Sequence, residues 1–581
     1  MSPDMFLLAA DVTGLAGTLE GLDLFIVGGY LALSLGLGLA LSRQSSREEF
    51  LTAGRSMGRI TVGLSVMATL FSANSFVMYP STAYGDSLRI MMASVAFLST
   101  TPLVIWVFIP VYSRLKCATA YDYLEQRFHV SVRCLASALF VILRIAWMAA
   151  ATFAASVAIS GIAGLDQFLV IIGLGIVAIV YTMFGGLRAV MWTDVIQFFV
   201  FFGTILFAAA LLVSGTEGGA TQIVETYFDN RDHMLFDFRL DPTIRFGTWA
   251  ILIGSFLEGL SAYGADQVAV QRYISARDAR TSQSGFVVSQ VASLIVMPGL
   301  LCIGMGLFSF FFHNPAMLSD VAIDALTAEP AGASGPGDAV VAVRQRLAES
   351  GVGGDVDQMA AHYAGHPGEL HADMVTLGLN DQALPRFVRL RFPAGVVGLL
   401  VAALMAATMS SIDSGIHSVT TALIVDFRDR LMPDWRPKTE RGEMLAARVM
   451  VVVIGALAIT LACYVGTLGD VFAVAKKTVG AFAAPLLAVF VLGLFVRRAT
   501  ATGVFLGTFA GAVVTLWFTF AETFSEWFEM WVFVVGFVSS VVFSIAFSLI
   551  PGLQLVKQSE GNRTWWGVVR DDNDVNEIRG E

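Results

Sequence analysis

The stretch ITVGLSVMATLFSANSFVMYPSTAYGDS, residues 60–87, is long and apolar enough to cross a membrane, but its middle is unsuited to one regular helix. A spanning helix needs about 20 mostly apolar residues. Here Ser72, Asn74 and Ser75 stand at the centre, and Pro80 follows. A proline removes a backbone donor, and polar groups in hydrocarbon need partners inside the protein. The pattern predicts an interrupted helix, and carbonyl groups freed at such breaks coordinate cations.

The composition of the whole chain is typical of a membrane protein. Of its 581 residues, 56% are hydrophobic and only 14% are charged, and the mean hydropathy is +0.72. Soluble proteins carry about 25% charged residues. Because a backbone in hydrocarbon must satisfy its own hydrogen bonds, these long apolar runs predict an all-α polytopic membrane protein. The four cysteines form no CxxC pair and indicate neither a disulfide framework nor a metal site.

Hydropathy predicts about thirteen transmembrane helices. Their expected ranges are 22–42, 59–84, 89–113, 136–162, 167–184, 189–214, 247–271, 285–313, 393–425, 444–465, 470–495, 501–521 and 529–550. Lys and Arg gather in alternate connections, such as residues 42–59 and 113–133. The positive-inside rule places these connections in the cytoplasm. We therefore expect a multi-pass protein of the inner or plasma membrane, with its N-terminus outside and its C-terminus cytoplasmic.

A second interrupted segment lies five spans after the first, in GTWAILIGSFLEGLSAYGADQVAVQRY, residues 247–273. It carries Glu258, Ser261, Asp266 and Gln267 among several glycines. A single such break is often a kink whose backbone is satisfied by neighbouring helices. Two breaks at matching places in two halves of a chain indicate an inverted-repeat transporter instead.

The segment ATMSSIDSGIHSVTTALIVDF, residues 407–427, is unusually polar for a predicted span. On a helix, Ala407, Ser411, Ser414 and Ser418 share one stripe, and Ser410 borders it. Small residues and serines allow close helix packing. Hydroxyl oxygens can equally bind a monovalent cation that carbonyl groups of the broken segment complete. The periodicity leaves both interpretations open.

Five motifs carry a family resemblance. They are VYSRLKCATAYDYLEQRF (111–128), GGLRAVMWTDVIQ (185–197), YGADQVAVQRYISAR (263–277), DQALPRFV (381–388) and MSSIDSGIHSVTTALIVDF (409–427). Together they look like the sodium/solute symporter family. MATLFSANSFVMYPSTAYG (67–85) is most similar to the branch that carries iodide, monocarboxylates and water-soluble vitamins. The resemblance implies thirteen spans, of which the second to the eleventh form a five-plus-five inverted repeat with broken helices.

This resemblance gives an expected domain layout. It comprises a first helix and cytoplasmic loop (1–58), a first repeat (59–214), an extracellular loop (215–246), a second repeat (247–495) that contains an outer loop (314–391), two accessory helices (496–550) and a cytoplasmic tail (551–581).

The resemblance also implies a sodium site. Its ligands would be the carbonyl groups of Ala68, Phe71 and Ala407 and the hydroxyl groups of Ser410 and Ser411. Asp194, in WTDVIQ, matches the family's aspartate near the cytoplasmic exit of that ion.

Polar and aromatic residues of the broken spans and their neighbours are expected to line a solute cavity. They are Ser72, Asn74, Ser75, Trp147, Glu258, Ser261, Tyr263, Gln267 and Ser414. Arg144 either clamps a substrate carboxylate or pairs with Glu258. Lys476 and Lys477 either snorkel to an interface or lie near the outer entrance. The three histidines of HYAGHPGELH (362–371) are better explained as residues of a solvated loop than as metal ligands.

The predicted function is a sodium-coupled symporter that imports a small polar solute by alternating access. A small organic anion such as a monocarboxylate suits the most similar branch. Asn74 and Ser75 stand where the sugar-carrying branch has a carboxylate and a glutamine, which disfavours sugar. The alternatives are symport of a sugar, polyol or amino acid, and a solute sensor with a transporter fold. The expected partners are sodium, one solute and the lipid bilayer, without nucleic acid, for a monomer or loose oligomer. We expect no enzyme, because Asp413, Ser414 and His417 on one helix cannot form a catalytic relay.

Overall fold

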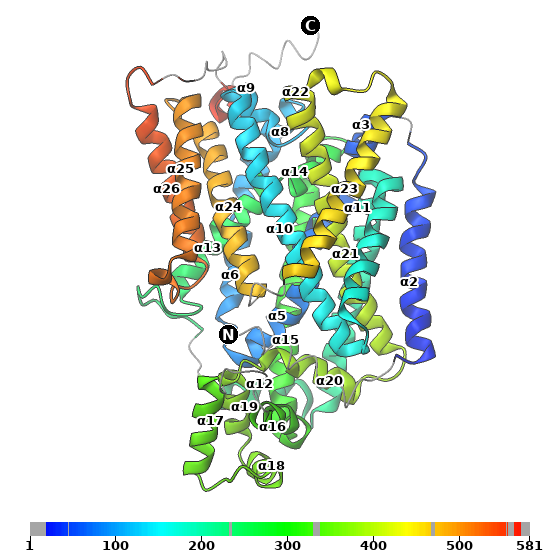
Figure 1. Ribbon diagram of the computed structural model, residues 1–581, viewed down its shortest axis with the longest axis vertical. Coiled ribbons are helices and arrows are strands. Elements are labelled where there is room, and N and C mark those ends of the chain that lie inside the picture. The colour runs from blue at the N-terminus through cyan, green and yellow to red at the C-terminus, as the bar shows by residue number, and fades with distance from the viewer. Residues whose placement is uncertain are drawn as a thin grey trace.

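The computed structural model describes residues 19–44, 46–231, 235–328, 337–465, 471–553, 555 and 563–570, with only the backbone described at 471–478. The described residues form helices and contain no strand; one isolated bridge joins Met57 and Ala276. Long helices run side by side between two ends of the molecule, and shorter helices gather at one end (Figure 1). We call that end the lower end and the opposite one the upper end, as they are drawn.

All thirteen predicted segments are helical over most of their described residues. The long helices are α2 (Gly21–Ala40), α10 (Val130–Ala163), α11 (Gln167–Gly215), α15 (Ala279–His313), α21 (Val396–Ala422), α23 (Glu440–Val465), α24 (Val471–Phe495), α25 (Ala501–Phe520) and α26 (Trp531–Ser548). In the described part of the chain, nine helical segments are long and apolar enough to cross a membrane, and one bent pair of helices qualifies together. The nine are the helices named above without α24, together with the segment Leu88–Arg114. The third predicted span is a run of short helices from Leu88 to Arg114.

The fifth and sixth predicted spans are two helices that join directly at a kink at Gly186, and together they make up α11. Its 49 residues would measure about 74 Å if straight, which is more than twice the thickness of a bilayer core. Gly186 has φ 55° and ψ −160°, a conformation that only glycine adopts easily. Phe50 also packs against the position that a side chain would occupy there. The bend therefore turns the chain without a loop between the two predicted spans.

The second predicted span is broken, as its sequence indicates. Helix α4 (Arg59–Leu70) ends at Phe71 and Ser72, which are extended, and α5 (Ala73–Gly85) begins at an angle of 63° to α4. The seventh predicted span is also broken. It comprises α13 (Thr248–Leu260), the π-helical turn η5 (Ser261–Ala265), an extended residue at Asp266, and α14 (Gln267–Ser275).

The two broken spans lie in the middle of the bundle. α4 and α5 pack against α15 and α21, and α14 packs against α4 and α21. α21 also packs against α10 and α11, so it contacts elements of both halves of the chain. Nearly all of α21 is buried, including its serines. Its polar groups therefore contact other helices and not lipid.

Short helices cover the lower end. They are α12 (Gly219–Asp229), α16 (Ser319–Thr327), α17 (Asp338–Glu349), α18 (Val356–Gly365), α19 (Pro367–Thr376) and α20 (Ala383–Arg391). Asn380, just before α20, donates from its amide to the Ser81 hydroxyl on α5 (3.0 Å). The guanidinium of Arg231 donates to the carbonyl groups of Tyr84, Gly85 and Asp86 at the end of α5. These contacts fix the lower half of the first broken span.

Candidate functional site

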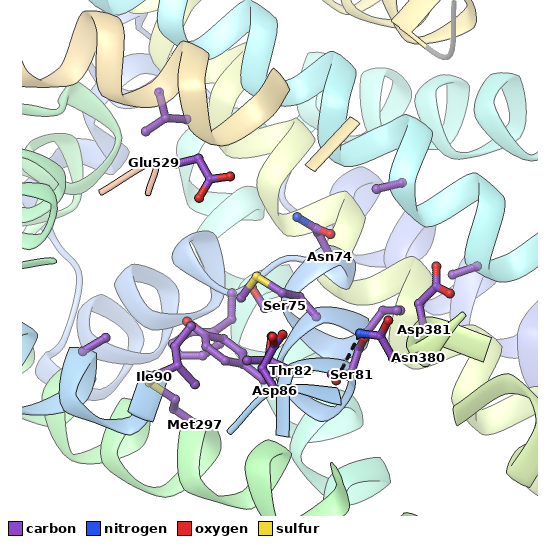
Figure 2. Close-up of a pocket in the computed structure, with 18 of the residues that line it drawn as sticks. Asn74, Ser75, Ser81, Thr82, Asp86, Ile90, Met297, Asn380, Asp381 and Glu529 are labelled. Carbon is purple, nitrogen blue, oxygen red and sulfur yellow. Dashed lines mark hydrogen bonds between the residues drawn. The ribbon is translucent and has the colours of Figure 1, made fainter. Parts of the chain in front are cut away.

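A cavity of about 1010 Å³ runs from the two helix breaks to the lower end of the bundle. Its inner part is lined by Phe71, Arg144 and Tyr263, and its outer part reaches Asp320 and Arg386 beside the short helices. Figure 2 shows Asn74 and Ser75 from the start of α5 in this cavity, with Asp86 and Asn380 nearby. The cavity is therefore a vestibule that leads to both breaks.

The first break lies directly beside the serine stripe of α21. The Ser410 hydroxyl lies 3.0 Å from the carbonyl oxygens of both Ala68 and Ala407, and the Ser411 hydroxyl lies 3.4 Å from that of Ala407. Carbonyl groups in the last turn of a helix lack amide partners within it. Four of the five predicted sodium ligands are thus in mutual contact, and all four offer neutral oxygen, which suits a monovalent ion that must also leave.

The fifth predicted ligand, Phe71, is extended at the break and lines the cavity. Its neighbour Ser72 is fully buried and lies outside the cavity lining, so it does not take the predicted cavity position. Among the described residues, nothing bonds to the Ser72 hydroxyl. An unpaired buried hydroxyl is costly, and here it lies next to the carbonyl groups of the break.

The second break carries a charged pair. Asp266 caps the start of α14 by accepting from the Val268 amide (2.8 Å). Arg144 on α10 donates to the same carboxylate from Nε (3.3 Å) and Nη2 (2.5 Å). The predicted pairing of Arg144 with Glu258 is therefore wrong, because the unwinding at Asp266 turns its carboxylate toward α10. An aspartate directly before a helical segment, here 267–275, is an N-cap signal. This signal would have indicated that the Asp266 side chain lies at the start of a helix.

The Arg144–Asp266 pair lines the cavity, and so does Trp147, three residues further along the same face of α10. Within the described residues, the indole N–H of Trp147 has no acceptor. The pair with Asp266 uses only Nε and Nη2 of Arg144, which leaves Nη1 for another partner. The cavity wall thus contains a guanidinium with one nitrogen outside its ion pair, and near it a buried indole N–H without an acceptor among the described residues.

Other predicted cavity residues divide into two groups. Asn74, Ser75, Trp147, Glu258, Ser261 and Tyr263 line the cavity. Gln267 does not, since it is fully buried and its side-chain oxygen accepts from the Ala120 amide (2.7 Å). Ser414 does not either, since its hydroxyl donates to Asp413 (3.1 Å) and accepts from Arg272. For Gln267 and Ser414 the predicted cavity position is wrong, because each lies on a helix face that packs against protein.

Asp194 belongs to a buried polar network between the first break and the upper end. Its Oδ2 accepts from the Ser65 hydroxyl (2.5 Å) and from Nη2 of Arg272 (3.1 Å). Arg272 on α14 also donates to Ser65 (2.8 Å), so the network joins α4, α11 and α14. Oδ1 of Asp194 has no partner in the described part of the chain. The sequence did not indicate Arg272 as a functional residue, although an arginine within an apolar core signals a buried partner.

The histidines of residues 362–371 and the lysines at 476 and 477 are the remaining residues that the sequence singles out. No group of three His, Cys, Asp or Glu residues suited to a metal ion occurs among the described residues. His362 instead contacts Glu369 (3.0 Å), and His371 contacts Arg231 (3.0 Å). The side chains of Lys476 and Lys477 lie outside the described residues.

Three comparisons with known proteins agree. The model of the sodium:solute symporter family matches residues 50–331 and 356–511. The human sodium/iodide cotransporter is 27% identical over 492 residues, which cover 84% of this chain and 67% of that protein. The sodium/sialic acid symporter NanT of Aliivibrio fischeri is 25% identical over 86% of this chain and 88% of its own length. A solved structure of a sodium-coupled sialic acid symporter, in a substrate-bound outward-open state, superposes with a TM-score of 0.75 at 25% identity, covering 91% of this chain and 97% of that one.

Proposed function

Because this chain belongs to the sodium:solute symporter family, and is thus a sodium-coupled membrane transporter and not an enzyme, we propose that its solute is a small organic anion such as a monocarboxylate. The observation that carries this proposal is the Arg144 guanidinium on α10, which lines the cavity beside the second break. The buried indole N–H of Trp147, which has no acceptor among the described residues, lies three positions further along α10. A carboxylate supplies the acceptors that these donors lack, and a guanidinium binds it strongly through charge-assisted hydrogen bonds.

The names of the relatives support an anion. The two relatives named above carry iodide and sialic acid, and the human sodium-coupled monocarboxylate transporter is 26% identical over 86% of this chain. These cargoes differ in size but share a negative charge. An anion also suits the Arg144–Asp266 pair, because one guanidinium can hold Asp266 through two nitrogens and a solute carboxylate through the third.

Sodium is proposed to bind at the first break. Ala68 and Phe71 supply carbonyl groups of the broken span, and α21 supplies the Ala407 carbonyl with the hydroxyls of Ser410 and Ser411. The ion would replace hydrogen bonds that now join these oxygens to one another. The bound sodium would tie α4 to α21, so it would favour the conformational state in which these two helices are close. A ligand that binds one state more tightly than another can change the affinity for a second ligand, and this is how sodium and solute would be coupled.

We place the lower end outside the cell, because the basic connections lie at the upper end and face the cytoplasm by the positive-inside rule. The cavity then opens outward and collects both ligands from outside. Asp194 accepts from Ser65, which lies one turn of α4 from Ala68 toward the upper end, and its Oδ1 has no partner among the described residues. We propose that it draws sodium toward the cytoplasm when the upper end opens.

The test is uptake into proteoliposomes that contain the purified protein, measured for a panel of small carboxylates, sugars and amino acids. An inward sodium gradient should drive accumulation of one or more carboxylates, and an equal potassium gradient should not. Accumulation of sugars or amino acids alone would refute the anion proposal. Equal uptake in both cations would refute sodium coupling through Ser410 and Ser411.

A further inference from the structure

A second cavity lies at the upper end, away from the solute vestibule. It measures about 390 Å³ and is formed where the connection after α2, the end of α8 (Ile109–Arg114) and the junction of α14 with α15 meet. Three basic side chains from these three elements line it: Arg55, Lys116 and Arg277. A cavity with basic groups on three separate segments is suited to an anionic ligand that contacts all of them.

The acidic residues of this cavity compensate only part of the basic charge. Asp278 is engaged as the N-cap of α15, where it accepts from the Thr281 amide (2.7 Å). Glu48 lies 3.8 Å from Arg55, and its side chain is 71% exposed, so solvent screens the contact. Among the described residues, Lys116 and Arg277 form no ion pair. Three cations thus face two carboxylates, one of which is already used.

A buried hydroxyl points to a ligand independently of the charges. Tyr273 is only 3% exposed and lines the same cavity, yet its hydroxyl has no hydrogen-bond partner within the described residues. A buried hydroxyl left unpaired costs free energy, so such groups normally have a partner in the protein or a bound molecule. The hydroxyl of Ser113 lies in the same lining and offers a second neutral donor.

Two backbone positions at the rim are strained. Arg55 has φ 50° and Lys116 has φ 49°, in the left-handed region that non-glycine residues rarely adopt. Arg55 also donates to the Lys116 and Cys117 carbonyl groups over long distances of 3.5 and 3.4 Å. Strain of this kind persists where the surroundings fix it, and it clusters at ligand sites. Here it holds the two basic residues on facing sides of one cavity.

We propose that this cavity is a binding site for a phosphate group, carried either by an anionic lipid headgroup or by a small soluble phosphate compound. Arg55, Lys116 and Arg277 would contact its oxygens, and the Tyr273 hydroxyl would donate to it. The proposal is independent of which solute the vestibule takes.

Occupancy of the site would affect the second broken span. The Met57 amide donates to the Ser275 carbonyl (3.0 Å), and the Arg277 amide donates to the Met57 carbonyl (3.4 Å), so the segment before α4 already touches the end of α14. A phosphate that bridges Arg55 and Arg277 would strengthen this contact between the two broken spans at the upper end. The bound anion would therefore favour the state whose upper end is closed.

The test uses the purified full-length protein in detergent, with inorganic pyrophosphate as the soluble probe, and the protein in nanodiscs of phosphatidylglycerol or of phosphatidylcholine. Thermal unfolding and pyrophosphate binding are measured for the wild type, Lys116→Gln, Arg277→Gln and Tyr273→Phe. Arg280→Gln is the matched control, because Arg280 is a nearby exposed arginine outside the cavity lining.

Saturable pyrophosphate binding that weakens about tenfold in each cavity variant, but not in Arg280→Gln, would support a soluble phosphate ligand. Stabilisation in nanodiscs of phosphatidylglycerol but not of phosphatidylcholine, without pyrophosphate binding and lost in the same variants, would support a lipid headgroup. Absence of both effects in the wild type would overturn the proposal. An equal loss of binding in Arg280→Gln would also overturn the proposal, since it would show that binding depends only on the net charge of the surface. Tyr273→Phe decides the part played by the hydroxyl: it should weaken binding while leaving the ligand-free protein as stable as the wild type.

Discussion

The two helix breaks occupy matching places in the two halves of the chain, yet they present opposite chemistry. The first break, at Phe71 and Ser72, exposes backbone carbonyl groups beside hydroxyls and carries no charge. The second, at Asp266, is a single extended residue whose carboxylate is held by Arg144. Neutral oxygens are suited to a small cation, and the arginine is suited to an anion. One architectural feature, repeated in both halves of the chain, thus presents neutral oxygens at one break and an ion pair at the other.

The largest expected effect comes from breaking the charged pair at the second break. Arg144→Gln leaves the nearly buried Asp266 carboxylate without its partner, which should lower the free energy of unfolding by about 3–5 kcal/mol and abolish anion uptake. Thermal unfolding and uptake in proteoliposomes measure the two effects.

The double variant Arg144→Gln with Asp266→Asn is the control. It removes both charges, so it should regain most of the stability while uptake of the anion stays abolished. Normal uptake by the double variant would show that the pair is only structural.

The first break should respond differently. Ser411→Ala removes one neutral ligand of the proposed sodium site, and the sodium concentration for half-maximal uptake should rise about tenfold, the effect of one lost polar contact. Thr408→Ala is a matched control on the same helix, because the Thr408 hydroxyl donates to the Leu404 carbonyl of α21 itself (2.7 Å). An unchanged sodium dependence in a correctly folded Ser411→Ala protein would remove this site assignment.

A milder change sharpens the assignment of the anion. Trp147→Phe keeps an aromatic ring in the cavity but removes the indole N–H, which has no partner among the described residues. The solute concentration for half-maximal uptake should rise about fivefold, close to 1 kcal/mol for one hydrogen bond. The sodium dependence should stay as in the wild type. A shift in the sodium dependence with no shift for the solute would contradict the separation of the two sites.

The smallest expected effect concerns the lower end of the first broken span. His371 on α19 is packed against Tyr84 at the end of α5 and against Phe308, and burial lowers its pKa to about 3, with Arg231 adding to the shift. The unfolded chain binds a proton near pH 6.5, so the neutral form stabilises the fold above that pH. This stability declines as the pH falls from about 6.5 to about 3.

Between pH 7 and pH 6 the loss should be about 0.7 kcal/mol. Thermal unfolding of the wild type and of His371→Asn across this range measures it. The wild type should lose more stability than the variant, and equal losses in the two proteins would show that His371 is not the responsible group.

Local sequence patterns predicted much of this molecule, because spans and helix breaks follow from nearby residues. Hydropathy located the thirteen segments, and the polar run at 72–75 located the first break to within two residues. The serine stripe of α21 also lies against the Ala68 carbonyl, as the proposed ligand set requires.

Three-dimensional pairing was harder to predict. Arg144 could have met either acidic residue of the seventh span, and only the point at which that span unwinds turns Asp266 toward it. A cavity position is expected for Gln267 because it is a polar residue of a broken span, and for Ser414 because it belongs to the serine stripe of α21. Helical periodicity shows which residues share a face but not whether that face meets a cavity or another helix. The gap between the predicted spans 167–184 and 189–214 brackets Gly186, so the sequence located this turn, but it did not reveal that a single glycine with positive φ makes it.

The measurement that tests the central claim most directly is thermal stabilisation of the wild type, Ser411→Ala and Arg144→Gln/Asp266→Asn by sodium alone and by sodium with the transported anion, with potassium as the reference cation. We predict that the double variant keeps the stabilisation by sodium and loses that by the anion. We predict that Ser411→Ala needs about tenfold more sodium for both effects. The opposite pattern, with sodium stabilisation lost in the double variant and unchanged in Ser411→Ala, would contradict the assignment of the ion to the first break and the solute to the second.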